Sequence, residues 1–218
     1  TAIAQAHFPD NQKMIERARQ RLSFDEFFLI QMAMLRQRHN WQSQPAQPLP
    51  SDEAALQQFL AALPFPLTDA QRRALDEIAG DLARSRPMSR LLQGDVGSGK
   101  TVVAAAAMRL ALAQGRQAAL MAPTEILAEQ HFKTLTGIFE KDPLAPAIRL
   151  LTGSLKKSEK QQVYADAAAG VAGVVVGTHA LIQEGVEFKD LALVVIDEQH
   201  RFGVEQRALL RQKGWSPH

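Results

Sequence analysis

The segment GDVGSGKT at residues 94–101 constrains the fold of this chain more than any other feature. It has the spacing G-x-x-x-x-G-K-[S/T], in which the backbone N–H groups of a glycine-rich loop wrap around phosphates. The apolar pair 91–92 precedes the segment and the helix-forming run 102–112 follows it. This is the strand, loop and helix order that a phosphate-binding P-loop requires.

The residue types in this loop suit ATP and Mg²⁺. Gly97 and Gly99 let the backbone approach the phosphates closely, and the start of the following helix adds partial positive charge. Lys100 has the length to reach the β- and γ-phosphates, and the hydroxyl of Thr101 is a ligand for Mg²⁺. We therefore predict that nucleotide is bound by Gly94, Gly97, Ser98, Gly99, Lys100 and Thr101.

From Leu67 onward, short apolar runs alternate with helical stretches. Runs of this kind indicate a parallel sheet covered by helices on both faces, so we predict a three-layer α/β fold. The predicted strands are residues 91–93, 118–121, 148–151, 174–176 and 193–196. The predicted helices are residues 69–84, 100–113, 125–139, 156–169 and 204–212.

The region before this pattern is predicted to be helical and to form a separate part of the chain. Apolar residues recur at three- and four-residue steps over 10–39, as one helix or two, and Ser23 with Glu26 resembles a capping box that starts a second helix. Three prolines within 45–50 indicate a linker, and Ser51 is a candidate cap for a short helix ending near Leu63. We therefore divide the chain into a helical segment, 1–50, and a nucleotide-binding domain, 51–218.

Composition narrows the function classes only slightly. The net charge of +2 permits a nucleic-acid partner without arguing for one. The absence of cysteine excludes a disulfide framework and a thiolate metal site, and it fits a reducing cytosol. No apolar run approaches the ~18 residues that cross a bilayer. We expect a cytoplasmic protein without a membrane partner, and the initial Thr1 is consistent with a processed or excised piece.

An acid pair follows the last predicted strand. Asp197 and Glu198 come directly after the apolar run 193–196, at the strand end where ligands bind parallel sheets. We predict that Asp197 holds Mg²⁺ and that Glu198 orients or deprotonates the attacking water; an ordinary acidic loop is the alternative. His200 is interpreted as a sensor of the nucleotide, or else as a hydrogen-bonded structural residue.

Taken in order, these segments resemble the first motor lobe of superfamily 2 helicases, which has a RecA-like fold. Residues 67–71 (LTDAQ) are similar to the entry motif of that family, in which the glutamine reads the adenine. The resemblance implies that Gln71 reads the base and that Phe65 or Leu67 packs on it. A plain helix start capped by Thr68 is compatible with the same residues.

Three further segments, 122–131, 152–154 and 177–179, resemble the DNA-contact motifs of these helicases. Each follows a predicted strand and precedes a helical run, so its N–H and hydroxyl groups are positioned to bind backbone phosphates without reading bases. The residues predicted to bind DNA are Thr124, Glu125, Gly153, Ser154, Gly177 and Thr178.

Two motifs narrow the resemblance to RecG-type helicases. Residues 94–104 and 197–204 look like that family, and 6–9 with 21–26 resemble the stretch that joins its wedge domain to its motor. The transcription-repair coupling family usually has an acid where this chain has Gln199. The resemblance implies a partner in branched DNA and roles in repair and recombination.

The resemblance also implies missing parts, namely the wedge and the second motor lobe. That lobe supplies an arginine finger, whose loss forfeits about 10³-fold or more in hydrolysis rate. We therefore expect this piece alone to bind nucleotide and hydrolyse it poorly. The alternatives are a translocase of the coupling type, a P-loop phosphotransferase or metabolic ATPase, and a nucleotide switch without unwinding activity.

Overall fold

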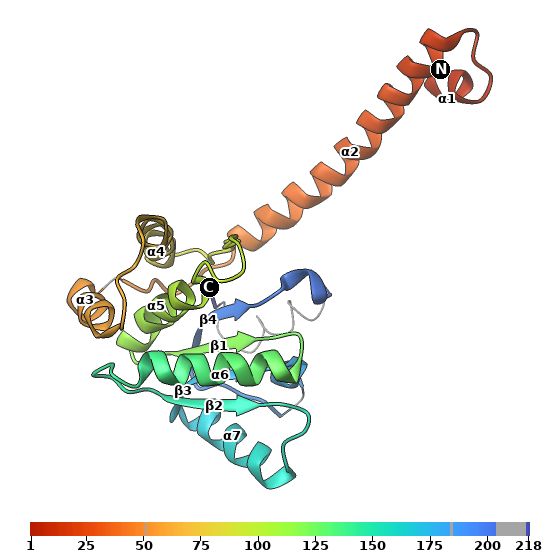
Figure 1. The fold of residues 1–218 in the computed structure, drawn as a ribbon. Coiled ribbons are helices and arrows are strands. Elements are labelled where there is room, and N and C mark those ends of the chain that lie inside the picture. The colour runs from red at the N-terminus through yellow and green to blue at the C-terminus, as the bar shows by residue number, and fades with distance from the viewer. Residues whose placement is uncertain (51, 184, 204–216) are drawn as a thin grey trace. The chain divides into compact units, whose positions relative to one another are not determined.

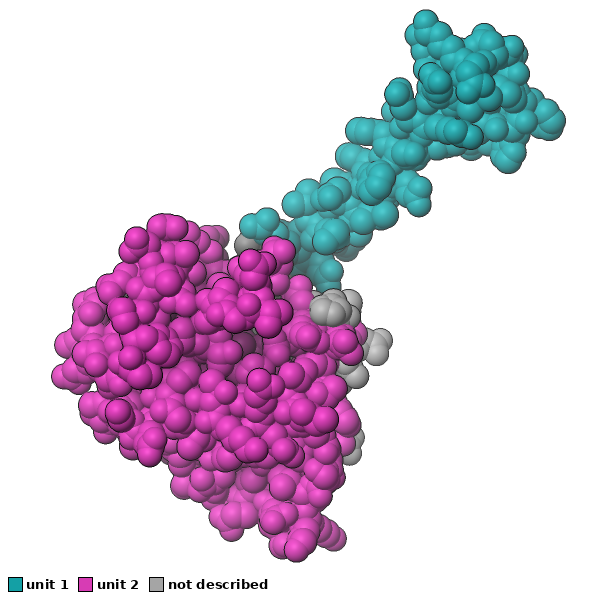
Figure 2. Space-filling model, in the orientation of Figure 1, with its two compact units in different colours: residues 1–44 teal, residues 45–218 magenta. Residues whose placement is uncertain are grey.

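The structure is a computed structural model, which describes residues 1–50, 52–183, 185–203 and 217–218, without the side chains of 41, 42 and 200. The chain forms two compact units, Thr1–Gln44 and Pro45–His218 (Figure 2). The predicted helix at 204–212 and the predicted cap Ser51 lie outside the described residues. Within the described ranges, no helix is long and apolar enough to cross a membrane.

The N-terminal unit consists of α1 (Ala2–His7) and α2 (Gln12–Gln42). The prediction that Ser23 starts a second helix is wrong, because α2 runs through it without a break. No glycine or proline interrupts residues 12–42, and an ion pair of 2.9 Å between Arg21 and Asp25 spans Ser23 one turn apart. A serine caps a helix only where the backbone leaves the helical conformation, and these neighbours keep it helical.

The C-terminal unit is built on a sheet of four described strands in the order β2-β3-β1-β4, all parallel (Figure 1). The strands are β1 (Gln117–Met121), β2 (Ala147–Leu151), β3 (Ala172–Gly177) and β4 (Leu191–Ile196). The helices are α3 (Glu53–Ala62), α4 (Asp69–Leu82), α5 (Lys100–Ala113), α6 (Glu125–Phe139) and α7 (Lys157–Ala169), with short 3-10 helices η1 (His179–Ile182) and η2 (Gln199–Arg201). These bounds confirm four predicted strands and four predicted helices.

Alternate residues of the central strand β3 contact different cores, which makes the fold three-layered. Val174 and Val176 of β3 lie in the core that includes α3, α4, α5 and α6. Val175 faces the opposite way, into a second core with residues of α7 and η1. Successive side chains of a strand point to opposite faces, so both faces of the sheet are covered, and the predicted three-layer α/β fold is confirmed.

The predicted strand at 91–93 is not formed. On the side of β4 away from β1, the backbone of His218 donates to Ala192 (2.8 Å) and accepts from Val194 (2.9 Å). A strand is defined by its ladder of hydrogen bonds, and no described strand pairs with 91–93. At this position an apolar run alone therefore does not predict a strand.

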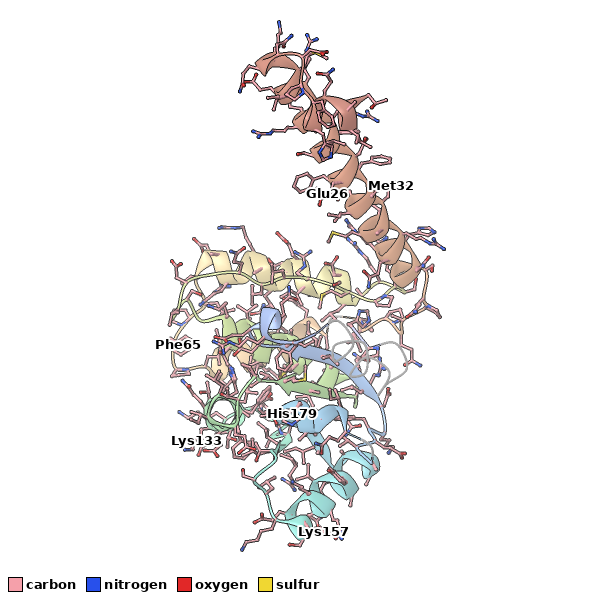
Figure 3. All side chains as sticks on the ribbon, turned by 90° about the vertical axis from the view of Figure 1, so that its right-hand side faces the viewer. Glu26, Met32, Phe65, Lys133, Lys157 and His179 are labelled. Carbon is pink, nitrogen blue, oxygen red and sulfur yellow. The ribbon has the colours of Figure 1, made fainter. Side chains whose placement is uncertain are left out.

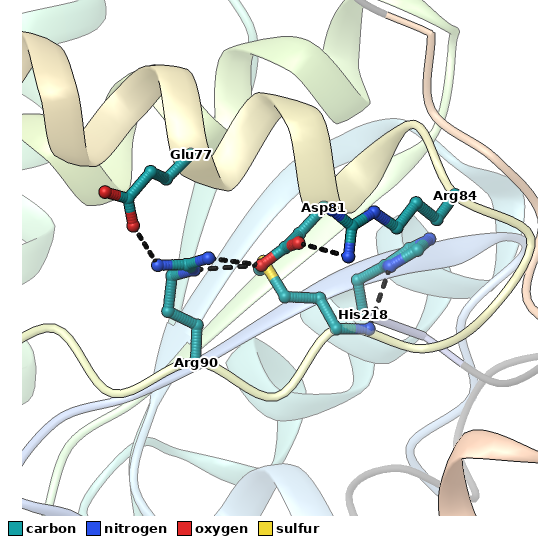
Figure 4. Close-up of polar contacts among 6 residues, drawn as sticks. Glu77, Asp81, Arg84, Arg90 and His218 are labelled. Atoms are coloured by element: carbon teal, nitrogen blue, oxygen red, sulfur yellow. Dashed lines mark hydrogen bonds and ion pairs between the residues drawn. The ribbon is translucent and has the colours of Figure 1, made fainter.

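Side-chain contacts, rather than the hydrogen bonds of a sheet, hold residues 88–90, which lead into the P-loop. Arg90 donates two hydrogen bonds to one carboxylate oxygen of Asp81, at 3.0 and 2.6 Å, and forms an ion pair with Glu77 (Figure 4). The hydrogen bonding with Asp81 raises the pKa of Arg90. The backbone N–H of Met88 donates to Nδ1 of His218 (3.1 Å), whose burial lowers its pKa.

Residues 45–50, which the sequence pattern places with the N-terminal segment, pack against the rest of the C-terminal unit. The backbone N–H of Leu49 donates to Leu82 (2.8 Å), and that of Ala46 donates to Ser85 (3.1 Å). The side chain of Leu49 is fully buried. The helix that follows is capped by Asp52, whose carboxylate accepts from the N–H of Ala55 (3.0 Å). The compact units consequently divide between Gln44 and Pro45.

A buried ion pair joins α5 to the turn after α6. Nε of Arg109 lies 2.7 Å from Oδ2 of Asp142, and the two side chains are 4% and 0% exposed. Neither of these two atoms meets hydrogen-bond geometry, so the contact is an ion pair. Asp142→Asn is expected to lower the free energy of unfolding by about 3–5 kcal/mol, because it leaves the Arg109 charge buried without a counterion.

Urea unfolding of the chain measures this effect. Asparagine keeps the oxygen that accepts from the N–H of Leu144 (3.0 Å), and it replaces the charged oxygen facing Arg109 with a neutral amide group. The double variant Arg109→Met/Asp142→Asn removes both charges and is expected to recover part of the loss. A single variant as stable as the parent chain would contradict the prediction.

Candidate nucleotide and nucleic-acid site

The P-loop has the backbone shape that phosphate binding requires. Gly97 and Gly99 have φ of 82° and 80°, in the left-handed region that side chains other than glycine rarely adopt. Gly99 is the N-cap of α5 and, having no side chain, makes no side-chain cap. A Cβ at Gly99 would also collide with the amide nitrogen of Gln71. The first-turn N–H groups of α5 are therefore free of a side-chain cap, as an anion site needs.

Lys100 lies across this loop. Its Nζ donates to the carbonyl oxygens of Gly94 (2.8 Å) and Asp95 (2.7 Å). An ammonium group has three donors, so one remains for a ligand in this position. Thr101 follows in the first turn of α5, half-buried, and Ser98 is exposed in the loop. The six predicted P-loop residues thus occupy one continuous loop and helix start.

Gln71 joins the entry motif to the P-loop. Its Oε1 accepts from the N–H of Thr68 (2.8 Å), and its own N–H donates to the Thr68 hydroxyl (3.3 Å), which is a full capping box. Its Nε2 donates to the carbonyl of Ser98 (2.9 Å). The alternative, a helix start capped by Thr68, is therefore confirmed. The side-chain amide of Gln71 additionally contacts the P-loop. Leu67 is buried in the core, whereas Phe65 is 48% exposed (Figure 3).

The acid pair ends β4 next to the end of β1. The N–H of Asp197 donates to the carbonyl of Met121 (2.9 Å), and Oδ1 of Asp197 accepts from the N–H of Glu198 (3.0 Å). Nε2 of His131, on α6, lies 2.8 Å from Oδ2 of Asp197. Sequence reasoning missed His131, although it belongs to the 122–131 segment.

Glu198 has a strained backbone. Its φ of 46° and ψ of 53° are left-handed, and among the described non-glycine residues only Ala145 shares a positive φ. Such strain costs about 1–3 kcal/mol and is concentrated at functional sites. The exposed Glu198 carboxylate forms an ion pair of 2.8 Å with Arg201. For His200 only the backbone, in η2, lies within the described residues.

The three predicted DNA-contact segments follow β1, β2 and β3, so they lie at the same edge of the sheet as the acid pair. Figure 3 views the C-terminal unit from this side. Thr124 is exposed and caps α6, where its hydroxyl accepts from the N–H of Leu127 (3.3 Å). Glu125 accepts from the N–H of Ser154 (3.0 Å), and hydrogen bonding to Ser154 lowers the pKa of Glu125. The loops after β1 and β2 are thereby linked.

The third segment differs from the prediction of an accessible hydroxyl. Thr178 is only 1% exposed, and its hydroxyl accepts from the N–H of Ala180 (3.5 Å). Gly177 pairs with both Met121 and Leu151, and a Cβ at this position would collide with the Leu151 carbonyl oxygen. Because β3 lies between β1 and β2, its end is packed from two sides, and both residues are buried.

Two further groups at this edge are not among the individual residues predicted to bind DNA. His179, next to Thr178, is exposed and lies near the middle of the view in Figure 3. Nζ of Lys160 donates to the carbonyl of Gly153 (2.6 Å), which brings a positive charge to the 152–154 loop. A lysine five to eight residues beyond a loop motif is a usable signal, because the first turns of the next helix lie beside the loop.

Comparison with known proteins agrees with this geometry. The DEAD/DEAH box helicase family matches residues 68–214. The ATP-dependent DNA helicase RecG of Synechocystis sp. is 52% identical over 220 residues, which cover 100% of this chain and 26% of that protein. RecG of Bacillus subtilis is 49% identical over 218 residues, which cover 99% of this chain and 32% of that protein.

A solved structure of RecG bound to a three-way DNA junction matches with a TM-score of 0.81 and 44% identity. The match covers 93% of this chain and 27% of the RecG chain. The present chain therefore spans about a quarter to a third of the length of these relatives. The resemblance to RecG is confirmed, and with the family match over residues 68–214 it shows that the chain belongs to the DEAD/DEAH box helicases.

Proposed function

We propose that this chain is the ATP-binding lobe of an ATP-dependent DNA helicase that remodels branched DNA. The proposed substrates are stalled forks and recombination junctions. The observation that carries the proposal is the P-loop, whose α5 N-terminus has no side-chain cap and whose Lys100 crosses the loop. The names of the relatives, and the junction in the related RecG structure, support DNA as the partner.

The residues present fit Mg²⁺ and ATP. In the proposed mechanism, the N–H groups of 97–101 and Nζ of Lys100 bind the phosphates, while Thr101 and Asp197 hold the metal. Bound Mg²⁺ neutralises charge that develops on the β- and γ-phosphates. Glu198 takes the proton of the attacking water, and its exposed carboxylate has only one described ion-pair partner to release.

The nucleoside is proposed to sit beside α4. Gln71 contacts the P-loop through Ser98, so an adenine read by this amide would lie close to the phosphate cradle. The half-exposed ring of Phe65 offers an apolar surface for the base. We keep His200 as a proposed sensor on the basis of its place after the acid pair.

DNA is proposed to bind through its backbone at the ends of β1 and β2. Thr124, with its exposed hydroxyl, and the 153–154 loop, with Lys160 beside it, are the groups available there. Glu125 already occupies the N–H of Ser154, so we propose that it positions this loop rather than contacting phosphate itself. Binding of this kind is indifferent to sequence and weakens as salt rises.

Steady-state ATP hydrolysis by the full-length protein tests the function. We expect a three-way DNA junction to stimulate hydrolysis strongly, and the chain on its own to be weakly active with or without DNA. A metabolic ATPase or phosphotransferase would show no stimulation by DNA. A nucleotide switch would bind both ligands without separating strands in a parallel unwinding assay.

The DNA interface gives a prediction that distinguishes contact from capping. Thr124→Asp is expected to weaken DNA binding by about tenfold or more, because a hydrogen bond to a phosphate is worth about 1.5–3 kcal/mol and is replaced by repulsion. The melting temperature should hold, because aspartate is an equally good N-cap. Thr124→Ser is the matched control for both measurements.

Thr178→Val is expected to behave in the opposite way. Its hydroxyl is buried, so its loss costs about 1 kcal/mol of stability and leaves DNA affinity unchanged. DNA titrations at two salt concentrations and melting curves measure both variants. Full DNA affinity in Thr124→Asp would remove this loop from the DNA path.

A further inference from the structure

The contact between His131 and Asp197 is the one side-chain bond described between α6 and the acid pair. Nε2 of His131 and Oδ2 of Asp197 are 2.8 Å apart, and the His131 side chain is 16% exposed. A carboxylate only accepts hydrogen bonds, so Nε2 carries the proton and donates it. The other oxygen, Oδ1, accepts from the N–H of Glu198 (3.0 Å). Both oxygens are therefore held, and the orientation of the carboxylate is fixed.

The same helix begins at the proposed DNA loop. Thr124 is the N-cap of α6, and His131 follows seven residues later, about 10 Å along the axis and on the same face. Ala128 and Leu135, one turn before and after His131, are fully buried in the core. Because backbone hydrogen bonds make a helix stiff, a shift at the first turn of α6 would also displace His131.

The 153–154 loop, which follows β2, is also bonded to α6. Glu125, in the first turn, accepts from Ser154, and the loop carbonyl at Gly153 accepts from Lys160 of α7. The loops after β1 and β2 are thus tied to the N-terminus of α6, while the acid after β4 is tied to its middle. One helix connects all three positions at this edge of the sheet.

We infer that His131 couples DNA binding to metal-nucleotide binding, acting as a positioning residue for Asp197. DNA that engages Thr124 and the 153–154 loop biases the position of α6, and the hydrogen bond from His131 transmits that bias to the carboxylate proposed to hold Mg²⁺. Coupling of this kind is reciprocal: nucleotide changes the affinity for DNA by the same factor as DNA changes the affinity for nucleotide. This inference rests on the proposed function.

Equilibrium binding tests the inference without relying on hydrolysis. In the full-length protein, affinity for a three-way DNA junction is measured with and without Mg²⁺ and the β,γ-imido analogue of ATP. The ratio of the two affinities is the coupling factor, for which about 5- to 150-fold is typical. We expect His131→Leu to bring this factor close to one. His131→Gln, whose amide N–H has a similar reach, should retain most of it.

Two further variants separate coupling from folding. His131→Asn keeps a polar side chain that is too short to reach Asp197, so it should lose coupling as His131→Leu does. It also provides the test if the leucine variant fails to fold. Thr134→Ala, at an exposed position of the same helix, is the control and should keep the coupling of the parent protein.

The outcomes discriminate between the inference and the function on which it rests. Full coupling in His131→Leu and His131→Asn, or equal loss in His131→Gln and Thr134→Ala, overturns the role of His131. A parent protein that binds both ligands without coupling overturns the inference and leaves the proposed function standing. A parent protein that does not bind the nucleotide analogue refutes the proposed function, and the inference with it.

Discussion

Replacing Glu198 with Gln in the full-length protein is expected to lower kcat for ATP hydrolysis by about 10²- to 10⁴-fold. The amide keeps the shape of the carboxylate but cannot take a proton from the attacking water. The strained backbone of Glu198, with φ of 46°, sets the direction of its side chain, and a glutamine side chain can take the same direction. Affinity for Mg²⁺-ATP should change little, so the variant should trap unhydrolysed nucleotide. Steady-state rates and nucleotide titration measure the two effects separately.

Two neighbouring variants serve as controls. Arg201→Gln removes the exposed ion-pair partner of Glu198, and a pair of this exposure is worth little, so kcat should change only slightly. Asp197→Asn should instead raise the Mg²⁺ concentration that hydrolysis requires. If Glu198→Gln turned over ATP at the parent rate, the proton acceptor would have to be another residue.

Lys100→Ala is expected to weaken ATP binding by about 10- to 100-fold, because a hydrogen bond to a charged group is worth about 1.5–3 kcal/mol and each 1.4 kcal/mol is tenfold. The fold should survive, since within the described part of the chain Nζ of Lys100 bonds to the carbonyls of Gly94 and Asp95 in its own loop. Nucleotide titration and the circular-dichroism spectrum are measured together.

An exposed lysine provides the matched comparison for Lys100. Lys133→Ala, on the surface of α6, removes the same charge away from the P-loop and should leave ATP affinity unchanged (Figure 3). Unaltered ATP affinity in Lys100→Ala would refute the phosphate-binding role, and a collapsed spectrum would show that the lysine is needed for the fold.

The elements that the sequence predicts well are those whose causes are local. Buried runs such as 174–176 become strands because a short run of consecutive apolar residues fits a strand covered on both faces. The P-loop follows from fixed spacing, since Gly97 and Gly99 must supply left-handed backbone at set positions. Helix α6 starts directly after Thr124 because the threonine hydroxyl caps the N–H three residues on.

The errors arise where a local pattern competes with a tertiary contact. Ser23 has the composition of a cap, yet the chain on both sides of it stays helical. The run 91–93 has the composition of a strand, yet no described strand forms a ladder with it. Thr178 has a hydroxyl suited to phosphate, yet the packing of β3 between two neighbours buries it.

The sequence by itself determined the class of fold, the nucleotide loop and the acid pair, because each depends on residues close together in the chain. Only the tertiary structure decided which groups meet. The strand order β2-β3-β1-β4 brings the end of β4 beside that of β1, so that His131 reaches Asp197 across 66 residues of sequence. It also lets Glu125 reach Ser154 past the end of β3. Side-chain spacing repeats within an element, whereas the order of strands is set by how complete elements pack, and local spacing carries no record of it.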